Sequence, residues 1–138
     1  MSKKQITMYA DGGARGNPGP AGSGAVLYDS DGKEIAALQK FLGKTTNNVA
    51  EYTAVIIGLE EAKKRNAEEV RVYMDSQLVV RQMSGEYRVR QPHLQLLYGK
   101  IQALLPAFTK VTFQHVPREK NERADELANA AMDSGMKQ

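Results

Sequence analysis

The order in which β-rich and helical segments follow one another constrains the fold of this chain most. Three short runs with strand character come first, at residues 5–10, 22–29 and 33–42. The sequence DSDG at 29–32 supplies a hairpin turn between the last two runs. Apolar residues then recur at helical spacing over 47–65, and a β-rich run follows at 70–74. This order predicts an antiparallel meander joined by a helical crossover to a parallel strand.

The second half of the chain continues the alternation. Residues 75–83 predict a short helix, Pro92 lies near the start of another, and Pro106 follows its end. A further strand is expected at 110–116 and a last amphipathic helix at 121–132. The predicted fold class is therefore α/β, with a mixed five-stranded sheet of three antiparallel and two parallel strands and helices on both faces.

Length and composition exclude several classes of protein. A chain of 138 residues with 41% hydrophobic and 25% charged residues is expected to form one domain over 1–138. The absence of Cys excludes disulfides and thiolate metal sites. The N-terminus turns polar too soon for a signal peptide, and no apolar run approaches the roughly 20 residues that span a bilayer. We therefore expect a cytoplasmic monomer without a membrane or an obligatory protein partner. The net charge of +3 suits a polyanionic partner or simply a solvated surface.

Four acidic residues occupy informative places. Asp11 lies at the end of the first strand, Glu51 in the first turn of a helix, Asp75 at the end of a strand, and Asp125 in the last helix. Each has an ordinary explanation as well. Asp11 could open a Gly-rich turn, and Asp75 could be the N-cap of a helix. Glu51 lies three residues after Asn48, which is near the spacing of a capping box, and Asp125 could lie on a solvated helix face.

The combination favours a metal site. If the first and fourth strands are parallel neighbours, Asp11 and Asp75 meet at one edge of the sheet, and Glu51 enters from the crossover helix. Two carboxylates about 4 Å apart repel by roughly 4 kcal/mol at an effective dielectric constant near 20, so a cluster requires protons or a cation. Oxygen ligands without Cys favour Mg²⁺ or Mn²⁺ over zinc.

Such a site suits phosphodiester chemistry. Two ions roughly 3.5–4 Å apart prepare a water nucleophile and stabilise the leaving oxygen of an in-line displacement. His115, at the end of the last strand, is then expected near the cluster, where a histidine can pass a proton at neutral pH. The alternative for His115 is a hydrogen-bonded surface residue.

Four separated motifs carry a resemblance that spans nearly the whole chain. In order, they are YADGGARGNPGPAG, TTNNVAEYTAVIIGL, VYMDSQLVV and HVPREKNERADELAN, and together they resemble type 1 ribonucleases H. The resemblance implies a ribonuclease H-like fold and metal-dependent hydrolysis of the RNA strand of RNA/DNA hybrids, with two Mg²⁺ ions for which Mn²⁺ substitutes. It also implies 3′-hydroxyl and 5′-phosphate ends. The metal-binding catalytic carboxylates are implied to be Asp11, Glu51, Asp75 and Asp125, and His115 matches the family's loop histidine.

The resemblance also implies contacts to the hybrid. In the family, polar residues after the first Asp and before the Glu touch the minor groove, where neutral amides can bridge the 2′-hydroxyls that distinguish RNA from DNA. Turn and capping chemistry is the alternative for these amides. Glycine allows close backbone approach, and arginine suits a phosphate. The predicted substrate-binding set is Gly12, Arg15, Asn17, Asn47, Asn48, Gln77 and Asn121.

The chain departs from some bacterial members of the family in one respect. Where those members carry a basic helix-and-loop insertion, GEYRVRQPHLQ runs almost directly from one predicted helix to the next. Arg81, Arg88 and Arg90 remain nearby as phosphate contacts, so weaker and more salt-sensitive binding is expected. The loop after His115 is short and contains a proline, which puts the mobility of the histidine in doubt.

Three other functions fit parts of the pattern. The same fold and carboxylates serve other metal nucleases, such as junction resolvases or cutters of double-stranded RNA. A non-catalytic hybrid-binding module is the second alternative, although a binder of polyanions gains nothing from four negative charges. A domain that binds a small metabolite is the third, and the placement of the Asn and Gln residues disfavours it.

Overall fold

The computed structural model describes residues 4–136. Its five strands are β1 (Gln5–Ala14), β2 (Gly19–Tyr28), β3 (Glu34–Thr45), β4 (Glu69–Met74) and β5 (Lys110–His115). They form one sheet in the order β3-β2-β1-β4-β5. The pairs β1–β2 and β2–β3 are antiparallel, whereas β1–β4 and β4–β5 are parallel. The predicted mixed five-stranded sheet is confirmed.

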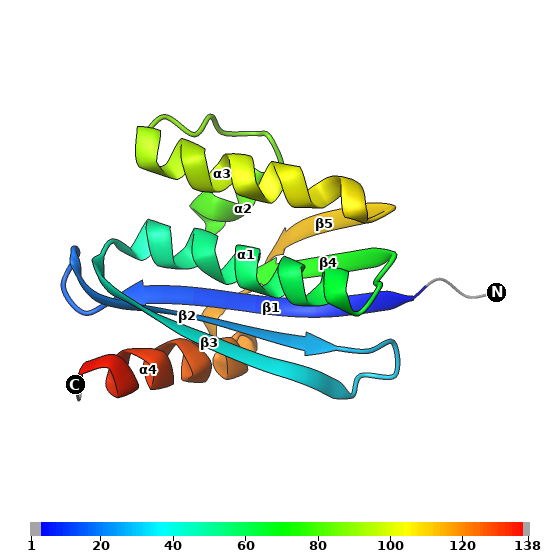
Figure 1. Cartoon of the computed structure of the whole chain (residues 1–138), viewed down its shortest axis with the longest axis horizontal. Coiled ribbons are helices and arrows are strands. Elements are labelled where there is room, and N and C mark those ends of the chain that lie inside the picture. The colour runs from blue at the N-terminus through cyan, green and yellow to red at the C-terminus, as the bar shows by residue number, and fades with distance from the viewer. Residues whose placement is uncertain (1–3, 137–138) are drawn as a thin grey trace.

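Helices cover both faces of this sheet. They are α1 (Asn47–Lys64), α2 (Gln77–Met83), α3 (Pro92–Leu104) and α4 (Glu122–Met136), with 3₁₀ turns η1 (Leu105–Ala107) and η2 (Arg118–Lys120). Figure 1 shows α1 and α3 on one side of the sheet and α4 on the other. None of the helices within residues 4–136 has the length and apolar content needed to cross a bilayer.

Strand alternation divides β1 between the two helical layers. Ile6, Met8 and Ala10 are buried in the core cluster that also contains the buried face of α1, while the residues between them are only half-buried. Tyr52 is fully buried on α1, and its hydroxyl donates to Gln82 Oε1 of α2 at 2.5 Å. Burial raises the pKa of Tyr52 to about 12, so the hydroxyl keeps the proton that this bond needs.

The observed boundaries correct the sequence predictions at three places. The strand predicted at 5–10 extends through Ala14, because Gly12 and Gly13 continue the antiparallel ladder with β2 and backbone pairing needs no side chains. Thr46 caps α1 by accepting from Val49 N, so Glu51 lies beyond the first turn and forms no capping box with Asn48. The remaining ranges agree within a few residues.

The third correction concerns the helix predicted to begin at Asp75. Ser76 is the N-cap of α2, and its side chain accepts from Val79 N at 3.3 Å. Asp75 lies between the end of β4 and this cap. Its carboxylate is therefore not needed to cap a helix.

Candidate active site

The sheet topology brings the four carboxylates to one cavity of about 420 Å³. The parallel ladder pairs Tyr9 with Tyr73, so Asp11 and Asp75 lie just beyond it on neighbouring strands. Glu51 comes from α1, which packs on β1, and Asp125 comes from the first turn of α4 on the opposite face. The cavity is lined by Asp11, Gly12, Gly13, Ala14, Arg15, Asn17, Asn47, Asn48, Glu51, Asp75, Arg118, Asp125, Ala128, Asn129 and Met132.

Burial and mutual repulsion perturb the ionisation of two of these carboxyl groups. The pKa of Asp11 is raised to about 8, first by burial and then by the charge of Asp75 and the hydrogen bond to Asp125, against a smaller opposing effect of Gly12 N–H. Burial also raises the pKa of Glu51 to about 7; a hydrogen bond from Ser76 opposes this rise and the charge of Asp75 adds to it. These couplings show that the four carboxyl groups form one electrostatic cluster.

A glycine allows the close approach that carries Glu51 to Asp11. A Cβ atom on Gly12 would lie 2.3 Å from the carbonyl carbon of Ala50, so no side chain fits between β1 and α1 there. The hydroxyl of Ser23 on β2 donates to the carbonyl oxygen of Ala50 at 2.6 Å and fixes the same turn of α1. Gly12 lines the cavity, and the position that a Cβ atom would occupy there lies against the backbone of α1.

Amide groups connect the β1–β2 turn to the start of α1. Asn47 Oδ1 accepts from the backbone N–H of Ala14 at 2.7 Å, and Asn17 Oδ1 accepts from the backbone N–H of Asn47 at 3.1 Å. Both bonds use the amide oxygen. The NH₂ groups of Asn17 and Asn47 have no partner within residues 4–136 and remain available as donors at the cavity wall.

The two arginines of the cavity differ in their partners. Arg15 donates to Asp133 at 2.6 Å and to Asn129 at 3.4 Å, so it ties the β1–β2 turn to α4. Its use as a phosphate ligand would require it to leave these partners. Arg118 is exposed and makes no ion pair within the described part of the chain.

The structure does not bring three of the predicted site residues into this cavity. Gln77 is exposed at the start of α2. His115 is exposed at the end of β5 and is paired in register with Met74, the residue before Asp75. Asn121 is buried, and its Nδ2 donates to the carbonyl oxygen of Ala10 at 3.0 Å.

The cluster suits a hard divalent cation, because such ions prefer oxygen ligands. A cation would also relieve the repulsion between these partly buried carboxylates. Within residues 4–136, no three His, Asp or Glu side chains are grouped closely enough to hold one metal ion together. The four carboxylates thus line the cavity as an open cluster.

Two contributors to the site were not predicted. Ser76 hydrogen-bonds Glu51 while capping α2, and the Asp-Ser pair at the end of a strand is the sequence signal for it. Asn129 lines the cavity, and its Nδ2 donates to the backbone carbonyl of Asp125 at 3.0 Å. The helical spacing Asp125, Asn129, Met132 would have indicated that this face of α4 borders the site.

Comparisons with known proteins show which proteins the chain resembles. A family model described as reverse transcriptase-like matches residues 9–131. A bifunctional protein of Mycobacterium tuberculosis is 50% identical over 131 residues, which cover 94% of this chain and 36% of the relative. A ribonuclease H of Desulforamulus reducens is 38% identical over 144 residues, covering 93% of this chain and 87% of the relative. The chain thus spans about a third of the mycobacterial relative.

Solved structures extend the likeness to three dimensions. The N-terminal RNase H domain of a Mycobacterium tuberculosis protein superposes with a TM-score of 0.94 at 47% identity, covering 98% of each chain. LC11-RNase H1 in complex with an RNA/DNA hybrid superposes with a TM-score of 0.90 at 46% identity, covering 95% of this chain and 99% of that one.

Proposed function

The chain belongs to the ribonuclease H family, and on that premise we propose that it is a metal-dependent endonuclease that hydrolyses the RNA strand of RNA/DNA hybrids. The observation that carries the proposal is the convergence of Asp11, Glu51, Asp75 and Asp125 on one cavity bordered by asparagine amides. The hybrid-bound relative, at 46% identity, supports the choice of substrate.

Asp11, Glu51, Asp75 and Asp125 would hold two Mg²⁺ ions, or Mn²⁺ in their place. Bound there, the ions would activate a water and neutralise the charge that develops on the phosphate and the leaving oxygen. In the proposed reaction the water oxygen bonds to phosphorus and the bond from phosphorus to the 3′-oxygen breaks. The products are a 3′-hydroxyl and a 5′-phosphate. Ser76 keeps the carboxylate of Glu51 oriented during this step through its hydrogen bond.

The amide groups give the site its preference for RNA. The amide oxygens of Asn17 and Asn47 already accept hydrogen bonds from backbone N–H groups. Their NH₂ groups therefore remain as donors for the substrate. Donors of this kind bind the 2′-oxygens and the minor-groove acceptors of any base, so they recognise the type of strand without selecting a sequence. Asn48 lines the same wall and is assigned the same role.

We assign auxiliary roles to His115, which lies outside the cavity at the end of β5, and to Arg118, which lines it. His115 ends the strand beside β4, and we assign it the transfer of the water proton to solvent. Arg118 at the cavity wall is free to bind a neighbouring phosphate.

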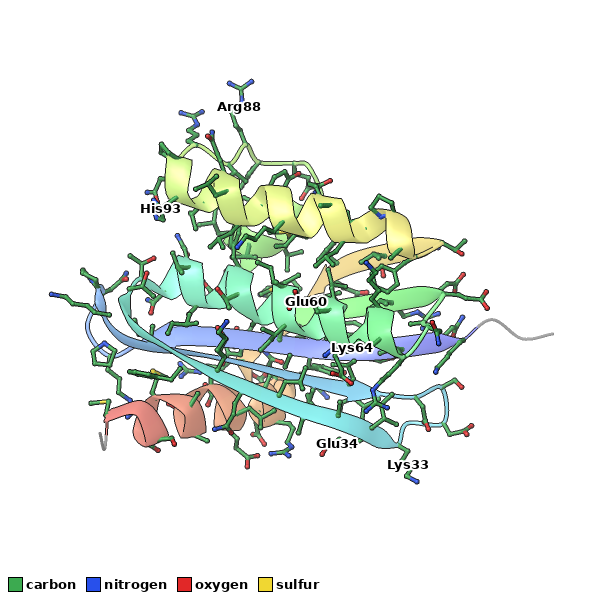
Figure 2. All side chains as sticks on the ribbon, viewed as in Figure 1. Lys33, Glu34, Glu60, Lys64, Arg88 and His93 are labelled. Carbon is green, nitrogen blue, oxygen red and sulfur yellow. The ribbon has the colours of Figure 1, made fainter. Side chains whose placement is uncertain are left out.

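Basic side chains away from the cavity extend the proposed hybrid contact. Figure 2 shows Arg88 and His93 protruding at the outer edge of the α3 layer. Arg81 is engaged by Tyr87, whose hydroxyl accepts from it at 2.7 Å. Only a few cations, Arg81, Arg88 and Arg90, lie in this region, so we expect weak hybrid binding.

A strand-resolved cleavage panel tests the proposal. One end-labelled sequence is presented as RNA/DNA hybrid, RNA duplex, DNA duplex and single strands, with Mg²⁺, Mn²⁺ or EDTA. We expect cleavage only of the RNA strand of the hybrid, only with metal, and with 3′-hydroxyl and 5′-phosphate ends. Preference for another duplex would reject the substrate, and tight hybrid binding without cleavage would indicate a non-catalytic module.

A further inference from the structure

A second cavity, of about 480 Å³, lies away from the carboxylates. It shares no lining residue with the first cavity. Its lining residues are Gln5, Ile6, Thr7, Tyr9, Tyr28, Asp29, Ser30, Gly32, Glu69, Arg71, Lys120, Asn121 and Arg123. Its volume lies within the range of about 300–1,000 Å³ that is usual for small-molecule sites.

The cavity forms where the α4 side of the sheet is left uncovered. Gln5, Thr7 and Tyr9 alternate with the buried core residues of β1 and so face away from α1. The β2–β3 hairpin, whose residues Lys33 and Glu34 are labelled in Figure 2, forms one side, and the segment from η2 into α4 forms another. With Glu69 and Arg71 of β4, four separate parts of the chain thus enclose this space.

Tyrosines form the apolar wall. The ring of Tyr9 stacks on Tyr73 with centroids 5.1 Å apart and planes at 24°. The ring of Tyr28 meets Tyr9 edge-on, at 5.9 Å and 90°. This mutual packing fixes the two rings that line the cavity, and rigid aromatic rings suit the stacking of a flat heterocycle.

Cations and carboxylates both line the cavity, and they differ in their partners. Arg123 is paired with Glu34 on β3 through two contacts of 3.0 and 3.4 Å. The carboxylate of Asp29 accepts from two backbone N–H groups of its own turn, and Glu69 accepts from Gln5 at 2.8 Å.

Two cations at this cavity have no such partner. Arg71 and Lys120 make no ion pair within residues 4–136. They are available to an anionic group on a bound molecule.

Asn121 adds a hydrogen-bonding group that lacks a partner. Its side chain is 1% exposed, yet no donor within the described residues reaches its Oδ1. A buried amide oxygen without a donor costs free energy, and Asn121 is among the residues that line the cavity.

We propose that this cavity binds one nucleotide unit, with its base against Tyr9 and Tyr28 and its phosphate at Arg71 and Lys120. A flat base and a phosphate match the aromatic rings and the two unpaired cations that line the cavity. The unit comes either from a free mononucleotide or from the 5′-phosphorylated end of a single strand. The proposal is independent of the cleavage reaction, because none of these residues lines the carboxylate cavity.

Calorimetric titration in EDTA tests the proposal, with adenosine 5′-monophosphate (AMP), adenosine and inorganic phosphate as probes. We expect AMP to bind more tightly than either of the other two. Arg71→Gln should weaken AMP binding by about tenfold, as for loss of one charge-assisted hydrogen bond, while adenosine binding is unchanged. Tyr28→Leu, which keeps the apolar bulk, should weaken both AMP and adenosine. Lys64→Gln is the control, because it removes one exposed positive charge outside the cavity.

A 5′-phosphorylated single-stranded oligonucleotide, compared with its 5′-hydroxyl form, distinguishes the two sources. If the 5′-phosphate tightens binding of the strand and Arg71→Gln abolishes this gain in affinity, the ligand is a strand end. Tighter binding of AMP than of the phosphorylated strand identifies a free nucleotide. The proposal is overturned if AMP does not bind at millimolar concentration, if phosphate alone binds as tightly, or if both variants bind AMP like the wild type. These readouts need no cleavage, so they remain valid if the proposed nuclease activity fails.

Discussion

At Asp11, the proposed metal site needs an ionised carboxylate, whereas burial and the neighbouring carboxylates disfavour the ionised form in the fold. It is buried in β1 next to Asp75 and Asp125, and its pKa is raised to about 8, while that of Glu51 is raised to about 7. A carboxyl group whose pKa is higher in the folded than in the unfolded state stabilises the fold while it is protonated. This contribution is complete below the ordinary pKa near 4 and is lost as the pH rises through about 8.

We therefore expect the metal-free protein to lose stability as the pH rises. In EDTA, the Tm should fall between about pH 5 and about pH 9, and Asp11→Asn should flatten most of that decline because the substituted amide cannot ionise. Asp31→Asn, an exposed aspartate of the β2–β3 hairpin, is the control and should keep the wild-type slope. An unchanged slope in Asp11→Asn would mean that Asp11 is ionised in the fold at low pH.

Single residues were predictable where the backbone alone sets their position. The predicted parallel pairing of neighbouring strands placed Asp11 and Asp75 together, and the structure agrees, although Asp11 lies within β1 and not at its end. The choice of Ser76 over Asp75 as the cap of α2 depends on one hydrogen bond, which sequence spacing does not determine. The burial of Asn121 likewise depends on how η2 and α4 pack against β1, a contact between residues far apart in the chain.

At the level of elements, the close contact between β1 and α1 sets the geometry of the site. The glycines of β1 and β2 that look like turn residues in the sequence belong to the strands, and their missing side chains admit the helices on either face. At Gly24, as at Gly12, an added Cβ would lie within 3 Å of a helix backbone. Sequence reasoning treats such glycines as breaks in a strand, which is why β1 was predicted to end at residue 10.

Gly12→Ala should therefore disturb both stability and activity. The added methyl group would meet the Ala50 carbonyl carbon at 2.3 Å, so α1 must move and carry Glu51 with it. We expect a loss of about 1–3 kcal/mol of unfolding free energy, measured by urea denaturation, together with a reduced cleavage rate. Gly99→Ala is the matched control, since nothing lies within 4 Å of its Cβ position on α3 and it should be neutral or slightly stabilising. Equal stability of the two variants would refute the tight contact.

At the scale of the whole molecule, the order of the sheet gathers acidic residues from both helical layers where β4 ends beside Asp11 of β1. The antiparallel and parallel halves of the sheet were predictable from the alternation of elements, as was the crossover through α1. The second cavity was not, because it depends on which part of the sheet α4 leaves uncovered.

A cluster gathered in this way should couple the stability of the whole fold to divalent cations. Added Mg²⁺ should raise the Tm by several degrees, because binding to the folded state alone stabilises it by mass action, by about 2.7 kcal/mol at a hundred times the Kd. The increase should be much smaller in Asp75→Asn. A Tm that stays constant over a wide range of Mg²⁺ concentration would contradict a site formed in the free protein.

The most direct measurement is to compare hybrid cleavage and hybrid binding in Asp75→Asn, with Asp31→Asn as the control. We predict that Asp75→Asn lowers the rate of RNA-strand cleavage in Mg²⁺ by at least about a hundredfold, the loss expected for removal of a metal ligand, while the Kd for the hybrid changes little. Asp31→Asn should match the wild type in both. Full activity of Asp75→Asn would contradict the account, because the carboxylate cluster would then not be the catalytic site.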